Sequence, residues 1–259
     1  MLVVVSPAKA LNFEDPDPGI AWTRPLLMAQ TRELMKTTRT LSAVDLAGLM
    51  GLSEKLADLN RDRFRAFRLE HTPENGKQAV LAFAGDTYRG LDAASLSSDD
   101  LDHAQTHLRI ISGLYGVLRP LDLIQPYRLE MGTRLNTPRG HSLYDFWGDR
   151  IARALNRDLK HMESPVVLNA ASKEYFSAIP PDRLKAPAIT PVFKEMRKGV
   201  ARTLGFTAKV ARGMMARYVI RNRIDSIEDL KSFDADGFRF DSGSSTASTF
   251  VFIRDPRLN

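Results

Sequence analysis

Cysteine is absent from the 259 residues of this chain. Its absence excludes disulfide bonds, thiolate zinc sites and cysteine nucleophiles. No apolar run approaches the roughly 18 residues of a membrane helix, so we expect no membrane contact. The N-terminus, MLVVVSPAKAL, has neither a basic leader nor a long apolar segment, which indicates a buried strand and not a signal peptide. We therefore expect a cytoplasmic protein.

The common signatures of enzymes are absent as well. The sequence contains no GxxxxGK(S/T), no GxGxxG after a strand, no GxSxG and no HExxH. His103 and His107 stand four residues apart, the spacing of two metal ligands on one helix face, but no third ligand follows at a recognised spacing. We therefore expect no metal and no cofactor, and the sequence identifies no catalytic residue.

The charge balance favours a polyanionic partner, because the net charge is +6 and the isoelectric point is near 9.6. The hydrophobic fraction of 43% is that of an ordinary globular protein with a sizeable core. The expected strands are spread over the whole length, and we find neither an internal repeat nor a separable domain. Residues 1–259 are therefore predicted to form one domain.

The stretch at 107–132, HLRIISGLYGVLRPLDLIQPYRLEMG, threads charged residues through an apolar run. A charge in a low-dielectric setting is costly unless it is paired or serves a ligand. Two interpretations are open. In the first, the stretch is a buried connection with internal Arg–Asp and Arg–Glu pairs. In the second, Arg119, Tyr127 and Arg128 line a basic cleft.

Six further segments belong, together with this central stretch, to one sequence pattern that runs along the chain. They are SPAK at 6–9, FAGDTYRGL at 83–91, LYDFWGD at 143–149, NAASKEYF at 169–176, PVF at 191–193 and ARGMMAR at 211–217. In this order they resemble the YaaA family of bacterial peroxide-stress proteins, over nearly the whole chain. The resemblance implies a cytosolic protein of the oxidative stress response that binds DNA. It also implies a single α/β (mixed α+β) body, with a mixed β-sheet surrounded by helices and a helix-hairpin-helix.

The segment at 41–67 predicts two short helices joined by a tight turn. Ser42 caps the first helix, Gly51 ends it and Ser53 caps the second. The pair resembles a helix-hairpin-helix, although Ser53 stands where the second glycine of that motif would be. A plain helical hairpin with a capping serine is the alternative.

In a helix-hairpin-helix, free backbone N–H groups and the positive end of the second helix dipole accept a phosphate. Gly51 allows close approach of the nucleic acid backbone, and Lys55 adds charge. Such contacts read no base sequence, so binding is expected to be sensitive to salt and indifferent to base order. The predicted contacts in this segment are Gly51, Leu52, Ser53, Lys55, Arg61 and Arg63.

The segment at 206–223, FTAKVARGMMARYVIRNR, predicts a basic helix. Lys209 and Arg212 lie on the side opposite the apolar face. One interpretation is a packed helix with a solvated basic face. The other is that this face lies along the cleft with Arg128, which adds Lys209 and Arg212 to the predicted DNA contacts.

Strands are predicted at 2–5, 79–84 and 166–168, and each ends in polar residues. If they are parallel neighbours, their ends converge at the carboxyl edge of the sheet, where α/β proteins place their sites. The candidate pocket consists of Ser6, Lys9, Asp86, Arg119, Tyr127, Arg128, Asn169, Ser172 and Lys173. This arrangement predicts a different function, that of an enzyme or a protein that binds a small anion.

Periodicity and turn residues predict the remaining elements. We expect an irregular loop at 14–25, helices at 25–40, 96–118 and 141–159, and a C-terminal hairpin from 238–240 and 249–253. Taken together, the sequence favours a monomeric, non-enzymatic protein that holds double-stranded or structured DNA by its phosphate backbone. The small-anion pocket around Lys9, Asp86 and Arg128 is the alternative.

Overall fold

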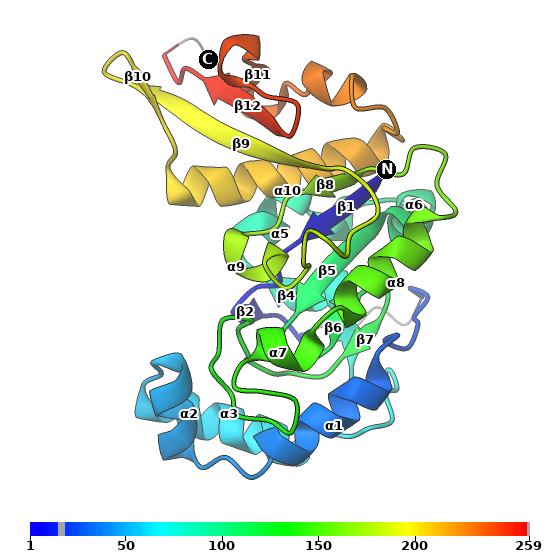
Figure 1. Ribbon diagram of the computed structural model, residues 1–259, viewed down its shortest axis with the longest axis vertical. Coiled ribbons are helices and arrows are strands. Elements are labelled where there is room, and N and C mark those ends of the chain that lie inside the picture. Colours follow the sequence, from blue (N-terminus) through cyan, green and yellow to red (C-terminus); the bar gives the residue numbers. More distant parts are fainter. Residues whose placement is uncertain (15–18, 258–259) are drawn as a thin grey trace.

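A mixed β-sheet forms the centre of the molecule (Figure 1). The computed structural model describes residues 1–14 and 19–257, and within these ranges eight strands form this one sheet. β1 (Leu2–Val5) lies between β5 (Leu108–Ser112) and β8 (Val167–Asn169) and is parallel to both. The predicted α/β fold with a mixed sheet and surrounding helices is therefore confirmed.

The sheet continues on both sides of these three strands. β9 (Ala188–Arg197) is parallel to β8, and β12 (Thr249–Arg254) is parallel to β9. Antiparallel strands complete the sheet, namely β6 (Gly116–Leu118) on β5, β10 (Val200–Arg202) on β9 and β11 (Arg239–Phe240) on β12. The parallel centre and antiparallel edges place the carboxyl ends of β1, β5 and β8 side by side.

The helices surround the sheet and extend the molecule beyond it (Figure 1). They are α1 (Met28–Thr38), α2 (Ala43–Met50), α3 (Glu54–Ala66), α4 (Ala79–Ala82), α5 (Asp86–Leu91), α6 (Ser98–His107), α7 (Leu143–Trp147), α8 (Arg150–Leu159), α9 (Lys173–Phe176) and α10 (Gly205–Arg221). Short 3-10 helices form at residues 93–95, 229–232, 235–237 and 242–244. Two small ladders pair β2 (Ala10–Leu11) with β4 (Phe83–Ala84), and β3 (Lys77–Gln78) with β7 (Leu123–Ile124).

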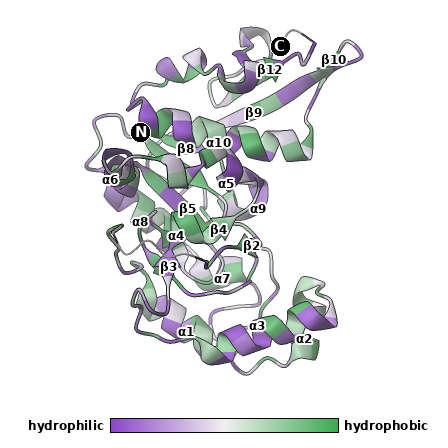
Figure 2. Ribbon diagram, turned by 180° about the vertical axis from the view of Figure 1, so that it is seen from behind, coloured by the Kyte–Doolittle hydropathy of each residue, from purple (hydrophilic) through white to green (hydrophobic). Residues whose placement is uncertain are grey.

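Continuous apolar runs explain why the central strands form. β1 (LVVV) is buried at every residue, as expected for a parallel strand that is covered on both faces. β5 (LRIIS) is also buried throughout, and its one charge, Arg109, is paired, because its Nε lies 2.8 Å from Asp158 Oδ2. In the hydropathy view these strands are largely green, whereas purple residues are frequent on the outer helices (Figure 2). The core therefore lies around the parallel strands.

Several predicted elements are confirmed. Strands were expected where β1 and β8 lie, helices where α1 and α10 lie, and a C-terminal hairpin where β11 and β12 pair. The strand expected at 79–84 is wrong, because 79–82 form α4 and only Phe83–Ala84 is extended, outside the large sheet. Of the loop expected at 14–25, residues 15–18 lie outside the described residues.

Two predicted helices are also corrected by the structure. The helix expected at 96–118 ends at His107, and the chain continues directly into β5. A short apolar run does not distinguish a buried strand from a buried helix, and the β-branched pair Ile110 and Ile111 favours the strand. The helix expected at 141–159 is divided into α7 and α8 by Gly148, whose φ of 51° is left-handed. Ser142 caps α7 as predicted.

Within the described part of the chain, we find no helix that is long and apolar enough to cross a membrane.

Candidate functional site

A pocket of about 400 Å³ lies at the carboxyl ends of β1 and β8. The loop after β1 contributes Ser6 and Lys9, and the start of α5 contributes Asp86. The loop after β8 contributes Ser172, and Arg212 lines the pocket from α10. The other charged or aromatic lining residues are Tyr88, Glu130, Glu174, Tyr175 and Lys209. This pocket lies at the edge of the sheet where α/β proteins commonly bind their ligands.

Hydrogen bonds hold the first loop of the pocket against its neighbours. The Ser172 backbone N–H donates to Ser6 Oγ at 2.8 Å, and the two hydroxyl oxygens are 3.3 Å apart. Tyr88 Oη donates to the Ser6 carbonyl oxygen at 3.0 Å. The ends of β1 and β8 and the start of α5 are therefore fixed relative to one another.

The carboxylates that line the pocket are each engaged by a neighbour. Glu130 Oε1 lies 3.1 Å from Lys9 Nζ and 3.0 Å from Arg128 Nη2. Glu174 Oε1 accepts a hydrogen bond from the Gly132 N–H at 2.9 Å. Asp86 Oδ1 lies 3.7 Å from Arg89, which is largely exposed. Lys9 is thus neutralised locally, and the acidic side chains are directed towards partners on their own side of the pocket.

The two cations that line the pocket from α10, Lys209 and Arg212, are not engaged in this way by a neighbouring side chain among the residues that the structure describes. Arg212 is half-buried, and desolvation lowers the pKa of its guanidinium from the usual value. Within the described residues, Arg212 makes neither a hydrogen bond nor an ion pair, and the same is true of the exposed Lys209. These positions are three apart on one helix and therefore share a face. The pocket thus carries uncompensated positive charge along its α10 side.

Four of the predicted pocket residues line this pocket, namely Ser6, Lys9, Asp86 and Ser172. Tyr127 and Arg128 line a small recess beside it, together with Lys9 and Tyr175. Tyr127 is buried there, with its hydroxyl 2.6 Å from Ser112 Oγ, and this burial raises the pKa of its phenol.

Three predicted residues do not line the pocket. Arg119 lies elsewhere, paired with Asp122 at 2.8 Å. Asn169 is buried and satisfied, since it donates to Thr190 Oγ1 at 3.1 Å and accepts from the Ala171 N–H. Lys173 is exposed. The Arg119–Asp122 and Arg128–Glu130 contacts are the internal pairs that the first interpretation of the central stretch expected.

The sequence did not place Tyr88, Glu130 or Tyr175 in the pocket, and it assigned Lys209 and Arg212 to DNA contacts along a cleft with Arg128. Tyr88 had a usable signal, since it follows Asp86 in the first turn of α5. Glu130 and Tyr175 had no such signal, because only the path of the chain brings them to the end of β1.

The helical hairpin forms with the predicted boundaries. Ser42 caps α2 through a capping box with Asp45, and Gly51 ends α2 in the left-handed conformation, with a φ of 61°. Ser53 is the N-cap residue of α3, but its side chain makes no capping hydrogen bond. Gly51, Ser53 and Lys55 are exposed, and Leu52 is half-buried.

The arginines of α3 differ in their surroundings. Arg61 is held by two carboxylates of its own helix, with its Nη1 2.6 Å from Asp58 Oδ1 and its Nε 2.9 Å from Asp62 Oδ1. Arg63 is half-buried, and desolvation lowers the pKa of its guanidinium. Arg61 is therefore less available to a ligand than Lys55.

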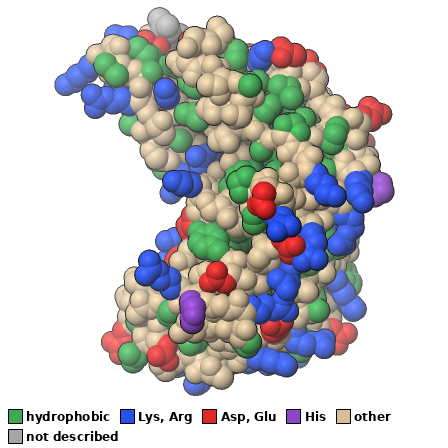
Figure 3. Space-filling model, viewed as in Figure 1, with side chains coloured by type: hydrophobic (Ala, Val, Ile, Leu, Met, Phe, Trp, Pro, Cys, Tyr) green, Lys and Arg blue, Asp and Glu red, His purple; other side chains and the backbone are tan. Residues whose placement is uncertain are grey.

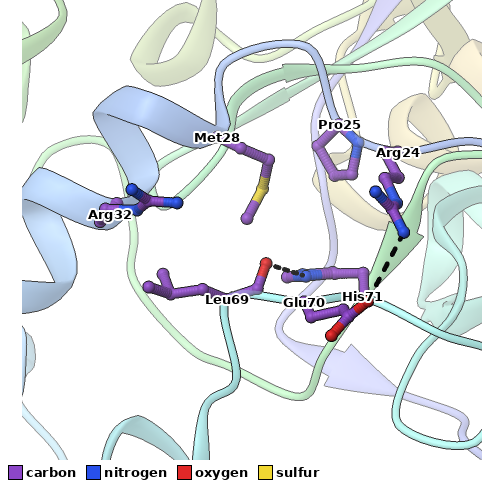
Figure 4. A pocket seen from close by; sticks show the side chains of 7 residues that line it. All are labelled: Arg24, Pro25, Met28, Arg32, Leu69, Glu70 and His71. Atoms are coloured by element: carbon purple, nitrogen blue, oxygen red, sulfur yellow. Dashed lines mark hydrogen bonds and ion pairs between the residues drawn. The ribbon is translucent and has the colours of Figure 1, made fainter.

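A second recess, of about 380 Å³, lies between α1 and the segment before β3 (Figure 4). Its histidine, His71, is buried, and desolvation lowers its pKa. Its Nε2 lies 2.9 Å from Tyr115 Oη, and its Nδ1 lies 3.3 Å from the Leu69 carbonyl oxygen. Arg24 lies 3.8 Å from Glu70 across the opening. These groups satisfy one another, so this recess is a weaker candidate for a binding site.

His103 and His107, the pair with metal-ligand spacing, stack on each other with ring centroids 3.8 Å apart. No group of three or more side chains suited to a metal occurs in the part of the chain that the structure describes. Burial, and then the neighbouring His107, lowers the pKa of His103 to about 4. The pair is therefore neutral at pH 7 and packs as two stacked aromatic rings.

This lowered pKa predicts a loss of stability in acid. The folded protein takes up the His103 proton only near pH 4, whereas the unfolded chain takes it up near the usual histidine pKa of 6.5, so stability falls as the pH drops from 6.5 towards 4. Thermal unfolding of His103→Gln across this range is expected to show a smaller drop than the wild type. The exposed His161→Gln is the matched control, and an equal drop in all three proteins would contradict the assignment.

Comparison with known proteins identifies the family. Residues 1–244 match the family model described as peroxide stress protein YaaA. The chain belongs to the YaaA family of peroxide stress proteins. It is 55% identical over 254 residues to a UPF0246 protein of Caulobacter vibrioides, covering 98% of this chain and 99% of that one. It is also 51% identical over 255 residues to a UPF0246 protein of Aliivibrio fischeri, covering 98% of both chains. The resemblance seen in the sequence is thus confirmed over nearly the whole chain.

Proposed function

We propose that this member of the YaaA family binds DNA in the cytoplasm as its part in the response to peroxide. It holds the phosphate backbone of double-stranded or structured DNA, as a monomer and without reading base order. The observation that carries the proposal is the turn between α2 and α3. There a left-handed Gly51 precedes a helix N-terminus whose Ser53 makes no side-chain cap, beside the exposed Lys55.

The first turn of α3 suits a phosphate for two reasons. Its N–H groups point out of the helix end, and the helix dipole adds partial positive charge at the same place. A side-chain cap would occupy one of these donors, but Ser53 provides none. Glu54 is the one acidic residue in this turn, and Lys55 lies next to it. A backbone phosphate can therefore approach the turn at Gly51 and be held without contact to a base.

The shape of the molecule supports a second set of contacts. One side is hollowed between the part that carries α2 and α3 and the part that carries α10, β9 and β10, and Lys and Arg side chains stand on both rims (Figures 1 and 3). The tip formed by β9 and β10 carries Arg197, Lys198 and Arg202. DNA held at the hairpin would meet these cations and Lys209 across the hollow, which raises affinity through the release of counterions.

The test is the affinity of a fluorescent DNA duplex across a salt series, for the wild type and for Lys55→Glu. Wild-type affinity is expected to fall steeply with salt, with equal values for unrelated base sequences. Lys55→Glu is expected to weaken binding about tenfold at low salt and to make the salt slope shallower by about one. Adding Arg61→Glu is expected to contribute less, because Arg61 is already engaged by Asp58 and Asp62.

Lys160→Glu is the matched control, since it makes the same charge change on an exposed lysine at the end of α8. It is expected to leave affinity near the wild-type value. If Lys55→Glu and Lys160→Glu weaken binding equally, the hairpin has no special part. If the wild type does not bind duplex or junction DNA at low salt, the proposed function is wrong. Sedimentation of the free protein tests the expected monomer.

A further inference from the structure

The pocket at the carboxyl ends of β1 and β8 has charge of opposite sign on its two sides. Lys209 and Arg212 line it from α10, while Asp86, Glu130 and Glu174 line it from the other elements. The three carboxylates are engaged by Arg89, by Lys9 with Arg128, and by the Gly132 N–H. They therefore do not neutralise the α10 side.

Arg212 is the least compensated charge of this pocket. It is half-buried, and among the described residues it has no hydrogen bond or ion pair. A guanidinium removed from water without a partner is costly, so its position is better explained by a ligand than by packing. Its planar fork matches two oxygens of a carboxylate or a phosphate. Lys209, one turn away, adds a second charge, which favours the dianion of a phosphate monoester over a carboxylate.

The rest of the pocket suits a neutral, polar body attached to that phosphate. Ser6 and Ser172 offer hydroxyl groups, and Asp86 and Glu174 offer acceptors for hydroxyl or amino groups of a ligand. Between them lie apolar surfaces of Pro7, Ala8, Ala84, Ala170 and Tyr175. The volume of about 400 Å³ falls in the range of small-molecule sites, roughly 300–1,000 Å³.

We propose that this pocket binds one nucleoside monophosphate unit, with its phosphate on Arg212 and Lys209 and its sugar and base between Tyr175 and the Asp86 side. Two ligands present such a unit, namely a free nucleotide and a single nucleotide within a DNA strand. β2, α5 and α9 lie between the two rims of the hollow, so a strand held there has access to the same region (Figures 1 and 3). The site itself does not depend on DNA binding by the hairpin.

The experiment is calorimetric titration of the full chain with the four deoxynucleoside 5′-monophosphates, with inorganic phosphate and with deoxyadenosine. At least one nucleotide is expected to bind saturably, at least tenfold more tightly than phosphate or the nucleoside alone. Arg212→Gln is expected to weaken this binding at least tenfold with unchanged thermal stability. Arg221→Gln is the matched control, because this exposed arginine of the same helix does not line the pocket.

Three results would overturn the proposal. The first is the absence of saturable binding of any nucleotide up to about 10 mM, far weaker than an ordinary small-molecule site. The second is equal binding of inorganic phosphate and nucleotide, which would leave a phosphate site without nucleoside recognition. The third is an equal loss of affinity in Arg212→Gln and Arg221→Gln.

Two further measurements determine where the bound nucleotide comes from and whether the hairpin takes part in binding it. If a single-stranded oligonucleotide displaces the bound mononucleotide, the pocket takes a nucleotide from a strand, and if it does not, the ligand is a free nucleotide. Either result supports the site. Lys55→Glu is expected to keep nucleotide affinity while it loses duplex affinity. If the protein binds a nucleotide but no duplex, the proposed function is contradicted and the proposed nucleotide site is still supported.

Discussion

Replacing Gly213 by alanine is expected to destabilise the protein by about 3 kcal/mol or more, the upper end of what overpacking costs. α10 and α5 cross here with their backbones in contact. A Cβ at position 213 would overlap the Thr87 carbonyl oxygen and lie 2.7 Å from Leu91 N. A Cβ at position 90, on the facing helix, would overlap the Val210 carbonyl oxygen and lie 2.9 Å from Met214 N. Neither backbone can move aside without separating the two helices.

The same contact shapes the candidate pocket, because α5 contributes Asp86 and α10 contributes Arg212. Chemical denaturation is the measurement, and nucleotide titration of any folded Gly213→Ala protein is expected to show weaker binding. Gly48→Ala is the matched control, since nothing lies within 4 Å of a Cβ at that position inside α2. Gly48→Ala is expected to stabilise the protein by about 0.5–1 kcal/mol. A Gly213→Ala protein as stable as the wild type would contradict the close crossing.

Replacing Asp122 by alanine is expected to cost about 3–5 kcal/mol, the range for breaking a buried ion pair. Asp122 is fully buried and accepts from Thr23 Oγ1 at 2.6 Å, from the Arg119 N–H at 2.8 Å and from Arg119 Nη2 at 2.8 Å. Arg119 Nη2 also donates to the Arg24 carbonyl oxygen at 3.0 Å. Alanine would leave the Thr23 hydroxyl without its acceptor, and Arg119 would keep only the Arg24 carbonyl oxygen.

Denaturant unfolding measures this loss, and Asp62→Ala is the matched control. Asp62 pairs with Arg61 on the surface of α3, where such a pair contributes only about 0–1 kcal/mol. The stability of Asp122→Asn is expected to lie between those of Asp122→Ala and Asp62→Ala, because asparagine keeps the shape of the side chain and loses its charge. If Asp122→Ala and Asp62→Ala were equally stable, the network around Arg119 would not hold this part of the fold.

The sequence determined the elements that local chemistry specifies. Ser42 and Gly51 set the limits of α2 because a capping side chain and a left-handed glycine act within a few residues. The run LVVV determined β1, and the pattern of apolar and basic residues determined most of α10. The family was likewise readable, since its segments recur in order along the chain.

Local signals failed where a run of apolar residues permits two structures. The sequence predicts the end of a helix where β5 forms, and a strand where α4 forms. Burial, and not periodicity, decided both, because a residue that is covered on every side shows neither the helical nor the strand period. For β5 the deciding interaction is its parallel pairing with β1, a partner about a hundred residues earlier in the chain.

The candidate pocket shows the same division between sequence and tertiary structure. Ser6 and Ser172 were predicted to meet because polar residues at the ends of parallel strands share one edge of a sheet. Arg119 was expected beside them, but its nearest acceptor is Asp122, three residues away along the chain. Arg212 reaches the pocket because Gly90 and Gly213 let α10 lie against α5. The sequence alone therefore determined which strand ends carry polar groups, and long-range helix packing decided which charges face them.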